Sequence, residues 1–194
     1  MVGGVLHPDY VRMEKKPVGK ISHPDRIRPP GYASLRRFRE SKPHADYFLT
    51  INLAERGRGL EQAALTPAVI AQWEKIEAEQ SWLVRTATVM PDHLHLLVRL
   101  GEIRSIEECV KLLKGRLSPE FRSSRLSWQD GFYDHELRPG DDVLAVFMYI
   151  YLNPYRAGLI TETQIWPGYR CRPEDWEWFG PLTREAVPQP EWLR

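Results

Sequence analysis

The sequence predicts an α+β fold in which two helices cover one face of an antiparallel sheet. Between about residues 46 and 137, stretches rich in β-branched and aromatic residues alternate with amphipathic ones, in the order strand, helix, strand, strand, helix, strand. The turn residues Pro91 and Asp92 join the second and third strands directly, which makes them a hairpin. This order is the split βαβ, or ferredoxin-like, arrangement, which RNA-recognition (RRM-like) modules share. The other face of the sheet is then free for a functional site and an added helix.

Each expected element has its own signal in the chain. The strands are expected at 46–53, 82–90, 93–100 and 128–137, the last with a bend near Asp130 and Gly131. The first helix should begin with Thr66 as its N-cap and run to about residue 79, and a capping box of Ser105 and Glu108 starts the second. A third helix should follow residues 139–142 and end at about residue 153, because the next residue is Pro154.

The apolar residues of these elements recur at the spacing of buried faces. The positions expected in the core are Leu94, Leu96, Val98 and Leu100 of the third strand, Val69, Ile70, Trp73 and Ile76 of the first helix, and Ile106, Val110, Leu113 and Leu117 of the second. They predict one continuous core between the sheet and these two helices.

The third strand also carries two histidines on its other face. Side chains alternate along a strand, so His93 and His95 share the face opposite to the aliphatic residues. Two imidazoles two residues apart can direct nitrogen atoms to one point, as a shared metal ion requires. A lone His-x-His is more often a pair of surface or half-buried histidines.

The third helix brings a second pair of functional side chains to one face. Tyr149 and Asn153 are four residues apart, so a hydroxyl nucleophile and an amide oxygen project side by side. Tyr151 is the competing nucleophile, but it lies about 200° around the helix from Tyr149. The two tyrosines therefore cannot face the same metal ion.

Three stretches together resemble the single-tyrosine HUH transposases, and in particular the REP-associated tyrosine transposases of bacteria. They are Met-Pro-Asp-His-Leu-His-Leu-Leu-Val at residues 90–98, Trp-Gln-Asp-Gly-Phe-Tyr-Asp-His at 128–135 and Tyr-Ile-Tyr-Leu-Asn-Pro-Tyr-Arg-Ala-Gly-Leu-Ile at 149–160. The resemblance runs from about residue 47 to residue 160. The order and separation of the three stretches make it specific.

The resemblance implies a metal-dependent endonuclease that cleaves and rejoins single-stranded DNA at hairpin, REP-like palindromic sequences. It implies that Tyr149 attacks a DNA phosphate to give a 5′-phosphotyrosine intermediate. It also implies that His93, His95 and Asn153 hold Mg²⁺ or Mn²⁺, although related transposases more often carry the longer glutamine at the last position. Arg156 falls on a family-typical position, where it either binds phosphate or braces the turn at Gly158.

A different reading is a catalytically silent, domesticated protein that binds DNA or RNA hairpins without cutting them. The expected sheet, a basic arm and aromatic side chains would suffice for this. The complete motif set argues against it, because a pure binder needs neither metal ligands nor an aligned tyrosine. The sequence leaves open whether the protein is a monomer or a homodimer.

Charge and composition divide the chain into three parts. Residues 1–43 form a basic, proline-rich arm, in which residues 1–42 carry a net charge of +6 although the whole chain carries only +1. Its Arg36, Arg37 and Arg39 surround an aromatic ring, a composition that suits phosphates and an unstacked base. Residues 44–160 form the transposase-like domain, and residues 161–194 form a tryptophan-rich tail expected to pack against it.

The composition also favours a cytoplasmic protein, and the resemblance implies a bacterial one that is nucleoid-associated when it acts. Cys109 and Cys171 form no zinc-ligand set or disulfide framework. The longest apolar run, from Val143 to Leu152, is half the length needed to span a bilayer, and no continuous apolar signal segment begins the chain. No membrane partner is expected.

Overall fold

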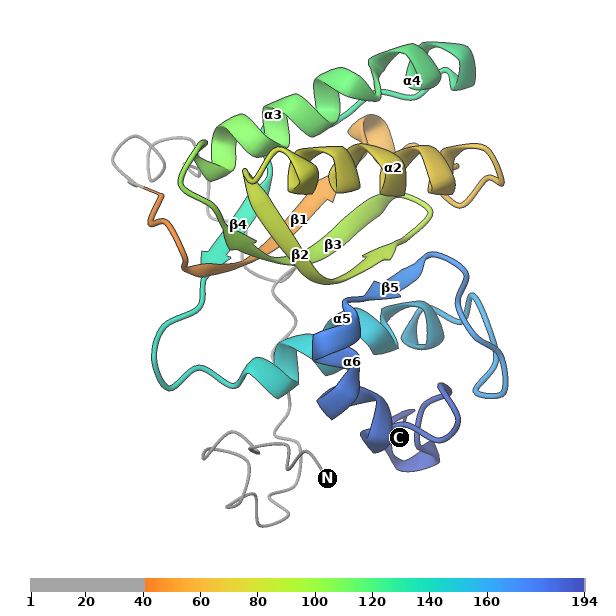
Figure 1. Cartoon of the computed structure of the whole chain (residues 1–194). Helices are drawn as coiled ribbons and strands as arrows, with labels where there is room; N and C mark the ends of the chain where they lie inside the picture. Colours follow the sequence, from red (N-terminus) through yellow and green to blue (C-terminus); the bar gives the residue numbers. More distant parts are fainter. Residues whose placement is uncertain (1–40, 194) are drawn as a thin grey trace. The chain divides into compact units, whose positions relative to one another are not determined.

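Five strands form one antiparallel sheet, in the order β4-β1-β3-β2-β5 (Figure 1). The computed structural model describes residues 41–193. Its strands are β1 (Asp46–Asn52), β2 (Trp82–Val89), β3 (His93–Leu100), β4 (Tyr133–Glu136) and β5 (Tyr169–Cys171). Its five α-helices are α2 (Leu65–Ala78), α3 (Ile106–Arg116), α4 (Ser118–Ser124), α5 (Val143–Arg156) and α6 (Pro173–Phe179). The expected α+β class and the β2–β3 hairpin are confirmed.

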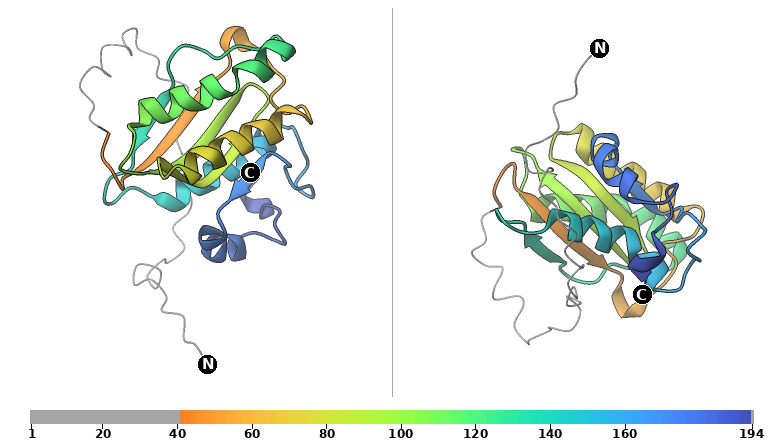
Figure 2. Two further views of the ribbon diagram at one scale, coloured as in Figure 1. Left: turned by 45° about the horizontal axis from the view of Figure 1, so that its top comes forward. Right: turned by 90° about the horizontal axis from the view of Figure 1, so that it is seen from below.

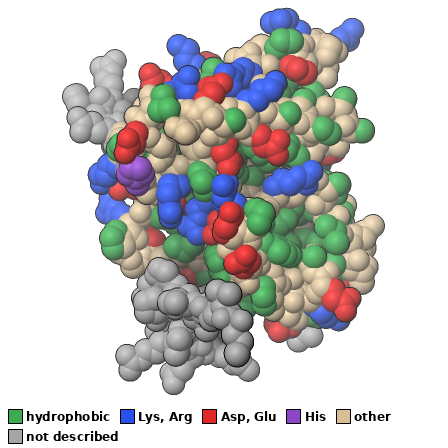
Figure 3. Space-filling model, in the orientation of Figure 1, with side chains coloured by type: hydrophobic (Ala, Val, Ile, Leu, Met, Phe, Trp, Pro, Cys, Tyr) green, Lys and Arg blue, Asp and Glu red, His purple; other side chains and the backbone are tan. Residues whose placement is uncertain are grey.

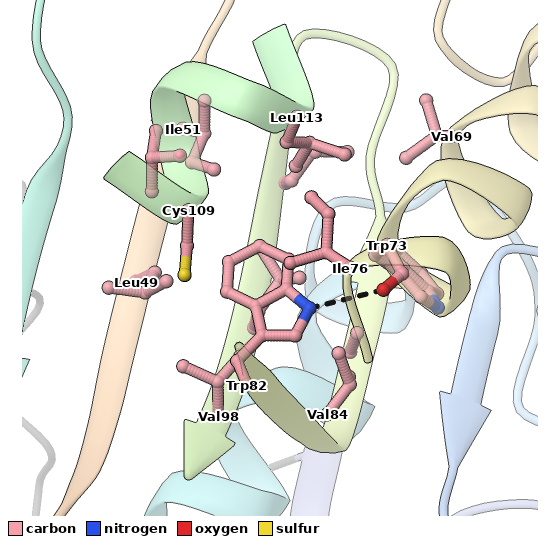
Figure 4. Close-up of a cluster of buried hydrophobic side chains, with 14 of the residues drawn as sticks. Leu49, Ile51, Val69, Trp73, Ile76, Trp82, Val84, Val98, Cys109 and Leu113 are labelled. Atoms are coloured by element: carbon pink, nitrogen blue, oxygen red, sulfur yellow. Dashed lines mark hydrogen bonds between the residues drawn. The ribbon is translucent and has the colours of Figure 1, made fainter. Parts of the chain in front are cut away.

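Helices α2 and α3 cover one face of the sheet, as Figure 1 shows. All the residues expected in the core from the third strand and the first two helices are buried there. Figure 4 shows the centre of this cluster, where the indole Nε1 of Trp82 donates to the backbone oxygen of Trp73 over 3.1 Å. The bond satisfies a polar atom that burial would otherwise leave without a partner.

Helix α5 lies against the opposite face of the sheet, beneath β2 and β3 in Figure 1 and in front of the sheet in the right-hand view of Figure 2. It packs with the C-terminal elements into a second, aromatic-rich cluster that includes Phe48, Leu97, Phe147, Tyr151 and Phe179. Asp142 is the N-cap of α5, and its carboxylate accepts from the backbone N–H of Ala145 over 3.0 Å. The sheet therefore separates an aliphatic core from an aromatic one.

The C-terminal elements also extend the sheet, which the sequence did not predict. Strand β5 pairs with the free edge of β2 along only three residues, too short a run to show a strand period. The guanidinium of Arg85 in β2 pairs with Asp175 of α6 and with Asp46 of β1, so buried charges tie the three elements together. The strand β4 is likewise short, because Gly131 adopts a φ of +69° and only an isolated bridge joins Trp128 to Leu53.

Two expected helix boundaries were wrong. Helix α2 begins at Leu65 after Ala64, and the Thr66 hydroxyl donates to the backbone oxygen of Leu60 instead of capping the helix. Helix α5 continues through Pro154 to Arg156. The proline removes one backbone hydrogen bond, but only in the last turn, where Pro154 is buried and its neighbour Tyr155 packs in the aromatic core. Within residues 41–193, no helix is long and apolar enough to cross a membrane.

Candidate active site

The alternation of β3 divides its side chains between the two cores as expected. The four aliphatic residues from Leu94 to Leu100 face α2 and α3, whereas Leu97 packs in the aromatic core on the other side. His93 and His95 belong to this second face, together with Leu97. The sheet thus places both imidazoles on the side of the tyrosine-bearing helix α5.

The two histidine rings converge on a single point. The Nε2 atom of His93 lies 2.9 Å from the Nε2 atom of His95, and the ring centroids are 4.4 Å apart. The His93 side chain is 19% exposed, whereas His95 is only 2% exposed. The pair therefore faces solvent only through His93.

The other nitrogen of each ring has a polar partner. His93 Nδ1 lies 2.8 Å from a carboxylate oxygen of Asp92, and this hydrogen bond holds the pKa of Asp92 below its usual range. His95 Nδ1 lies 3.0 Å from the hydroxyl of Thr50, which is buried on β1 directly opposite His95. Because a carboxylate only accepts, His93 carries its proton on Nδ1 and presents a lone pair at Nε2.

Tyr149 approaches the same point from α5. Its hydroxyl oxygen lies 3.4 Å from Nε2 of His95, and the side chain is 8% exposed. The Tyr149 ring stands edge-on to Phe48 at 5.6 Å and to His95 at 5.1 Å between centroids. These contacts fix the ring of Tyr149 beside the histidine pair.

The donor set fits a divalent cation. Two Nε2 atoms at 2.9 Å need either a proton or a cation between them, since two lone pairs repel. With a proton on His95 Nε2, Thr50 donates to Nδ1; with a cation, Nδ1 carries the proton and Thr50 accepts it. A hydroxyl can do both, so Thr50 accommodates either tautomer.

No cluster of three or more histidine, cysteine or acidic side chains within residues 41–193 has metal-binding geometry. A third protein ligand beside His93 and His95 would therefore have to be of another type, such as an amide. Asn153 is half-buried on α5, one helical turn after Tyr149, and its side chain makes no hydrogen bond to the described residues. Its amide is thus not committed elsewhere.

The other candidate residues lie away from the histidines or outside the described residues. The Tyr151 hydroxyl donates to the backbone oxygen of Ala186 over 2.8 Å, and burial raises the pKa of Tyr151. Arg156 is exposed, with one Nη 3.5 Å from the backbone oxygen of Trp192. Arg36, Arg37 and Arg39 lie outside residues 41–193.

Sequence reasoning missed the two side chains that hold the histidines. The sequence predicts Asp92 only as a turn residue, although its position next to His93 also indicates a candidate hydrogen-bond partner for the imidazole. Thr50 carried no such signal, because its contact depends on the register that pairs β1 with β3. The histidine pair on β3 therefore takes one partner from its own turn and one from the adjacent strand β1.

Comparison with known proteins identifies the family. The family described as "Transposase IS200 like" matches residues 45–142, about half of the chain. This chain belongs to the IS200-like transposase family. The matched region of this chain contains both histidines and ends before Tyr149 and Asn153.

Two curated relatives are both named as REP-associated tyrosine transposases. An Escherichia coli K12 protein named REP-associated tyrosine transposase is 25% identical over 125 residues, which cover 62% of this chain and 73% of that protein. A Haemophilus influenzae protein that carries the same name provisionally is 29% identical over 113 residues, 45% of this chain. The matched region spans 62% of the H. influenzae protein.

A solved structure shows the same fold. It is described as a REP-associated tyrosine transposase bound to a REP hairpin, and it covers 79% of this chain at 20% identity with a TM-score of 0.59. The alignment covers 93% of that chain. At this identity, the match establishes the shared architecture of sheet and helices.

Proposed function

We propose that this transposase is a metal-dependent endonuclease that cleaves and rejoins single-stranded DNA at hairpin sequences. One observation supports this most strongly: the Nε2 atom of His95 lies 3.4 Å from the Tyr149 hydroxyl and 2.9 Å from the Nε2 atom of His93. A nucleophile beside a cation-binding pair is what phosphodiester cleavage needs. The strand order β4-β1-β3-β2 also supports the ferredoxin-like assignment.

In this proposal Tyr149 is the nucleophile, and His93, His95 and Asn153 hold Mg²⁺ or Mn²⁺. The bound ion supplies positive charge to the non-bridging oxygens of the scissile phosphate. The Tyr149 oxygen forms a bond to phosphorus while the bond from phosphorus to the 3′ oxygen breaks. The proton lost by the Tyr149 hydroxyl is matched by one taken up by the departing 3′ oxygen, which becomes a free 3′-hydroxyl. The phosphate has exchanged its ester bond to the 3′ oxygen for one to Tyr149. A different 3′-hydroxyl can therefore attack the 5′-phosphotyrosine, release Tyr149 and join two strands.

Two residues next to the histidines would prepare them for this role. Asp92 keeps the proton of His93 on Nδ1, so Nε2 is available as a ligand. Thr50, by contrast, keeps its hydrogen bond to His95 Nδ1 in either tautomer, so Nε2 of His95 is also available as a ligand. The rings of Phe48 and His95 hold the Tyr149 side chain in place, which reduces the freedom the nucleophile must lose before attack.

The proposed substrate is single-stranded DNA with a REP-like hairpin. The names of the relatives and the DNA in the similar structure support it. Arg156 is a candidate phosphate contact, because its charge is exposed on the same helix as Tyr149. Arg36, Arg37 and Arg39 of the N-terminal arm remain candidates on sequence grounds, and the protein acts as a monomer or a homodimer.

The test is adduct formation on a denaturing gel. The purified protein is mixed with labelled hairpin DNA in Mn²⁺, in Mg²⁺ and in chelator. We expect a metal-dependent covalent band that Tyr149→Phe abolishes, while the variant still binds the DNA on a native gel. The matched control is Tyr151→Phe, which should keep the band because the Tyr151 hydroxyl is bonded to a C-terminal backbone oxygen.

Two results would contradict the proposal. A band that survives in Tyr149→Phe and disappears in Tyr151→Phe would exchange the roles of the tyrosines. Metal-independent binding of the hairpin without any covalent band would favour the silent hairpin-binding protein.

A further inference from the structure

A cavity of about 300 Å³ lies between α5, β5, α6 and the loop that precedes β5. Five aromatic side chains form most of its wall: Tyr151, Tyr155, Trp166, Tyr169 and Trp176. We call it the aromatic cavity. Hydrophobic side chains also gather on the surface over the C-terminal elements, at the lower right of Figure 3.

The polar atoms of four of these five aromatic residues already have partners. The hydroxyls of Tyr151 and Tyr155 donate to backbone oxygens over 2.8 and 2.7 Å. Trp166 Nε1 donates to the backbone oxygen of Val89 over 3.0 Å, and the Tyr169 hydroxyl accepts from Thr86 over 3.1 Å. The cavity therefore offers ring surfaces to a ligand and few hydrogen-bonding groups.

The rim of the cavity combines an exposed apolar side chain with a cation. Ile165 is 63% exposed, one of two large hydrophobic residues so exposed in the described part of the chain. The exposed Arg170 uses one Nη for bonds to the backbone oxygens of Pro167 and Tyr169. No acidic side chain of residues 41–193 pairs with Arg170, so its charge is available to an anion.

The aromatic cavity lies close to the candidate active site. Tyr169 on β5 is paired with Thr88 on β2, and Thr88 is paired with His95 on β3. Two strand spacings therefore separate Tyr169 from His95, about 10 Å across the sheet. The cavity lies on the other side of α5 from the histidines, because Tyr151 in its wall is opposite Tyr149 on that helix. A DNA strand whose phosphate is at the histidines would therefore pass α5 to place a nearby nucleotide in the cavity.

We propose that the aromatic cavity binds one unpaired nucleobase of the DNA strand while Arg170 binds an adjacent phosphate. This rests on the function proposed above. A nucleobase has two flat faces that stack on aromatic rings, and such stacking tolerates any base because it needs no hydrogen-bond readout. The volume is at the lower end for ligand cavities, which suits one base and not a larger molecule.

The proposal identifies a function for the C-terminal elements that the histidine and tyrosine motifs do not require. Trp166, Tyr169, Arg170 and Trp176 all come from residues 161–194. The base would be held outside the duplex, since a paired base cannot enter a cavity. This part of the chain would thus fix the position of the single strand relative to Tyr149.

The experiment uses a DNA hairpin with a single-stranded tail on each side, and 2-aminopurine at one tail position at a time. Stacking on an aromatic ring quenches this fluorescent base. We expect quenching at one position, or two neighbouring positions, when the full-length protein binds. Trp166→Ala should remove the quenching and weaken binding about 5- to 150-fold, the range for loss of one stacked base. The matched control is Trp178→Ala, a tryptophan of α6 that does not line the cavity.

A second variant keeps the test valid if Trp166→Ala does not fold. Arg170→Gln should lower the slope of log affinity against log salt by about one, the effect of one lost phosphate contact. The exposed Arg184, outside the cavity, is the matched control, and Arg184→Gln should leave the slope unchanged.

The same samples are run on the denaturing gel for the Tyr149 adduct, which separates the two proposals. If the adduct forms and no tail position is quenched, the cavity proposal is wrong and the proposed function stands. Equal loss of quenching in Trp166→Ala and Trp178→Ala would also overturn it. If the wild-type protein binds no hairpin at all, both proposals fail.

Discussion

Removal of the Asp92 carboxylate should weaken metal binding without unfolding the protein. In the structure this carboxylate accepts from His93 Nδ1 over 2.8 Å and so directs Nε2 of His93 toward His95. Loss of such an outer partner of a metal-bound histidine costs about 10- to 100-fold in metal affinity. The Asp92 side chain is 49% exposed, and water can replace part of its effect, so we expect a loss at the lower end of this range. Asp92→Ala should therefore bind Mn²⁺ about tenfold more weakly, or about 1.4 kcal/mol.

The measurement is a Mn²⁺ titration followed by electron paramagnetic resonance, with calorimetry as a second readout. Asp92→Asn retains an acceptor oxygen but no charge, and its affinity should lie between those of the wild type and Asp92→Ala. The matched control is Asp141→Ala, which removes a carboxylate 3.4 Å from the exposed His135, outside the site. Equal Mn²⁺ affinities of Asp92→Ala and the wild type would refute the orienting role, as would an equal loss in Asp141→Ala.

Further predictions concern stability and thiol reactivity. Tyr151→Phe should lower the free energy of unfolding by about 1 kcal/mol in urea, the value of one hydrogen bond; no change would contradict the buried contact. Arg85→Leu should cost about 3 kcal/mol, because it removes the ion pair of Asp175, which keeps only the hydrogen bond from Trp178 Nε1, while Asp46 keeps its ion pair with Arg99; a loss below about 1 kcal/mol would contradict this. Burial raises the pKa of the Cys109 thiol to about 12, so at pH 8 it stays protonated and should react with a disulfide reagent only after unfolding; rapid reaction of the native Cys171→Ser variant, which lacks the half-buried second thiol, would contradict this.

Much of the fold could be predicted because the signals are local and repeat along the chain. The alternation from His93 to Leu100 determined which side chains face the helices, and every expected aliphatic position of β3 is buried. The capping box of Ser105 and Glu108 started α3 where expected, with both hydrogen bonds formed. In these elements, local preference and tertiary packing favour the same structure.

Predictions were wrong where packing overrides a local preference. Pro154 biases the preceding residue away from helical geometry, yet α5 continues because its last turn is buried among aromatic side chains. The strand β5 exists only because the edge of β2 offers unpaired backbone groups to Tyr169, Arg170 and Cys171. Three residues show no period that could reveal this pairing in the sequence.

The candidate site shows the same division between local and tertiary information. Sequence spacing placed His93 beside His95, and it separated Tyr149 from Tyr151 on opposite sides of one helix. The register of β1 against β3 then brings Thr50 to His95, a contact between residues 45 positions apart. Since that hydroxyl can either donate or accept, the buried histidine can change tautomer without losing its partner. Such a change is what a metal site built on a preformed histidine pair requires.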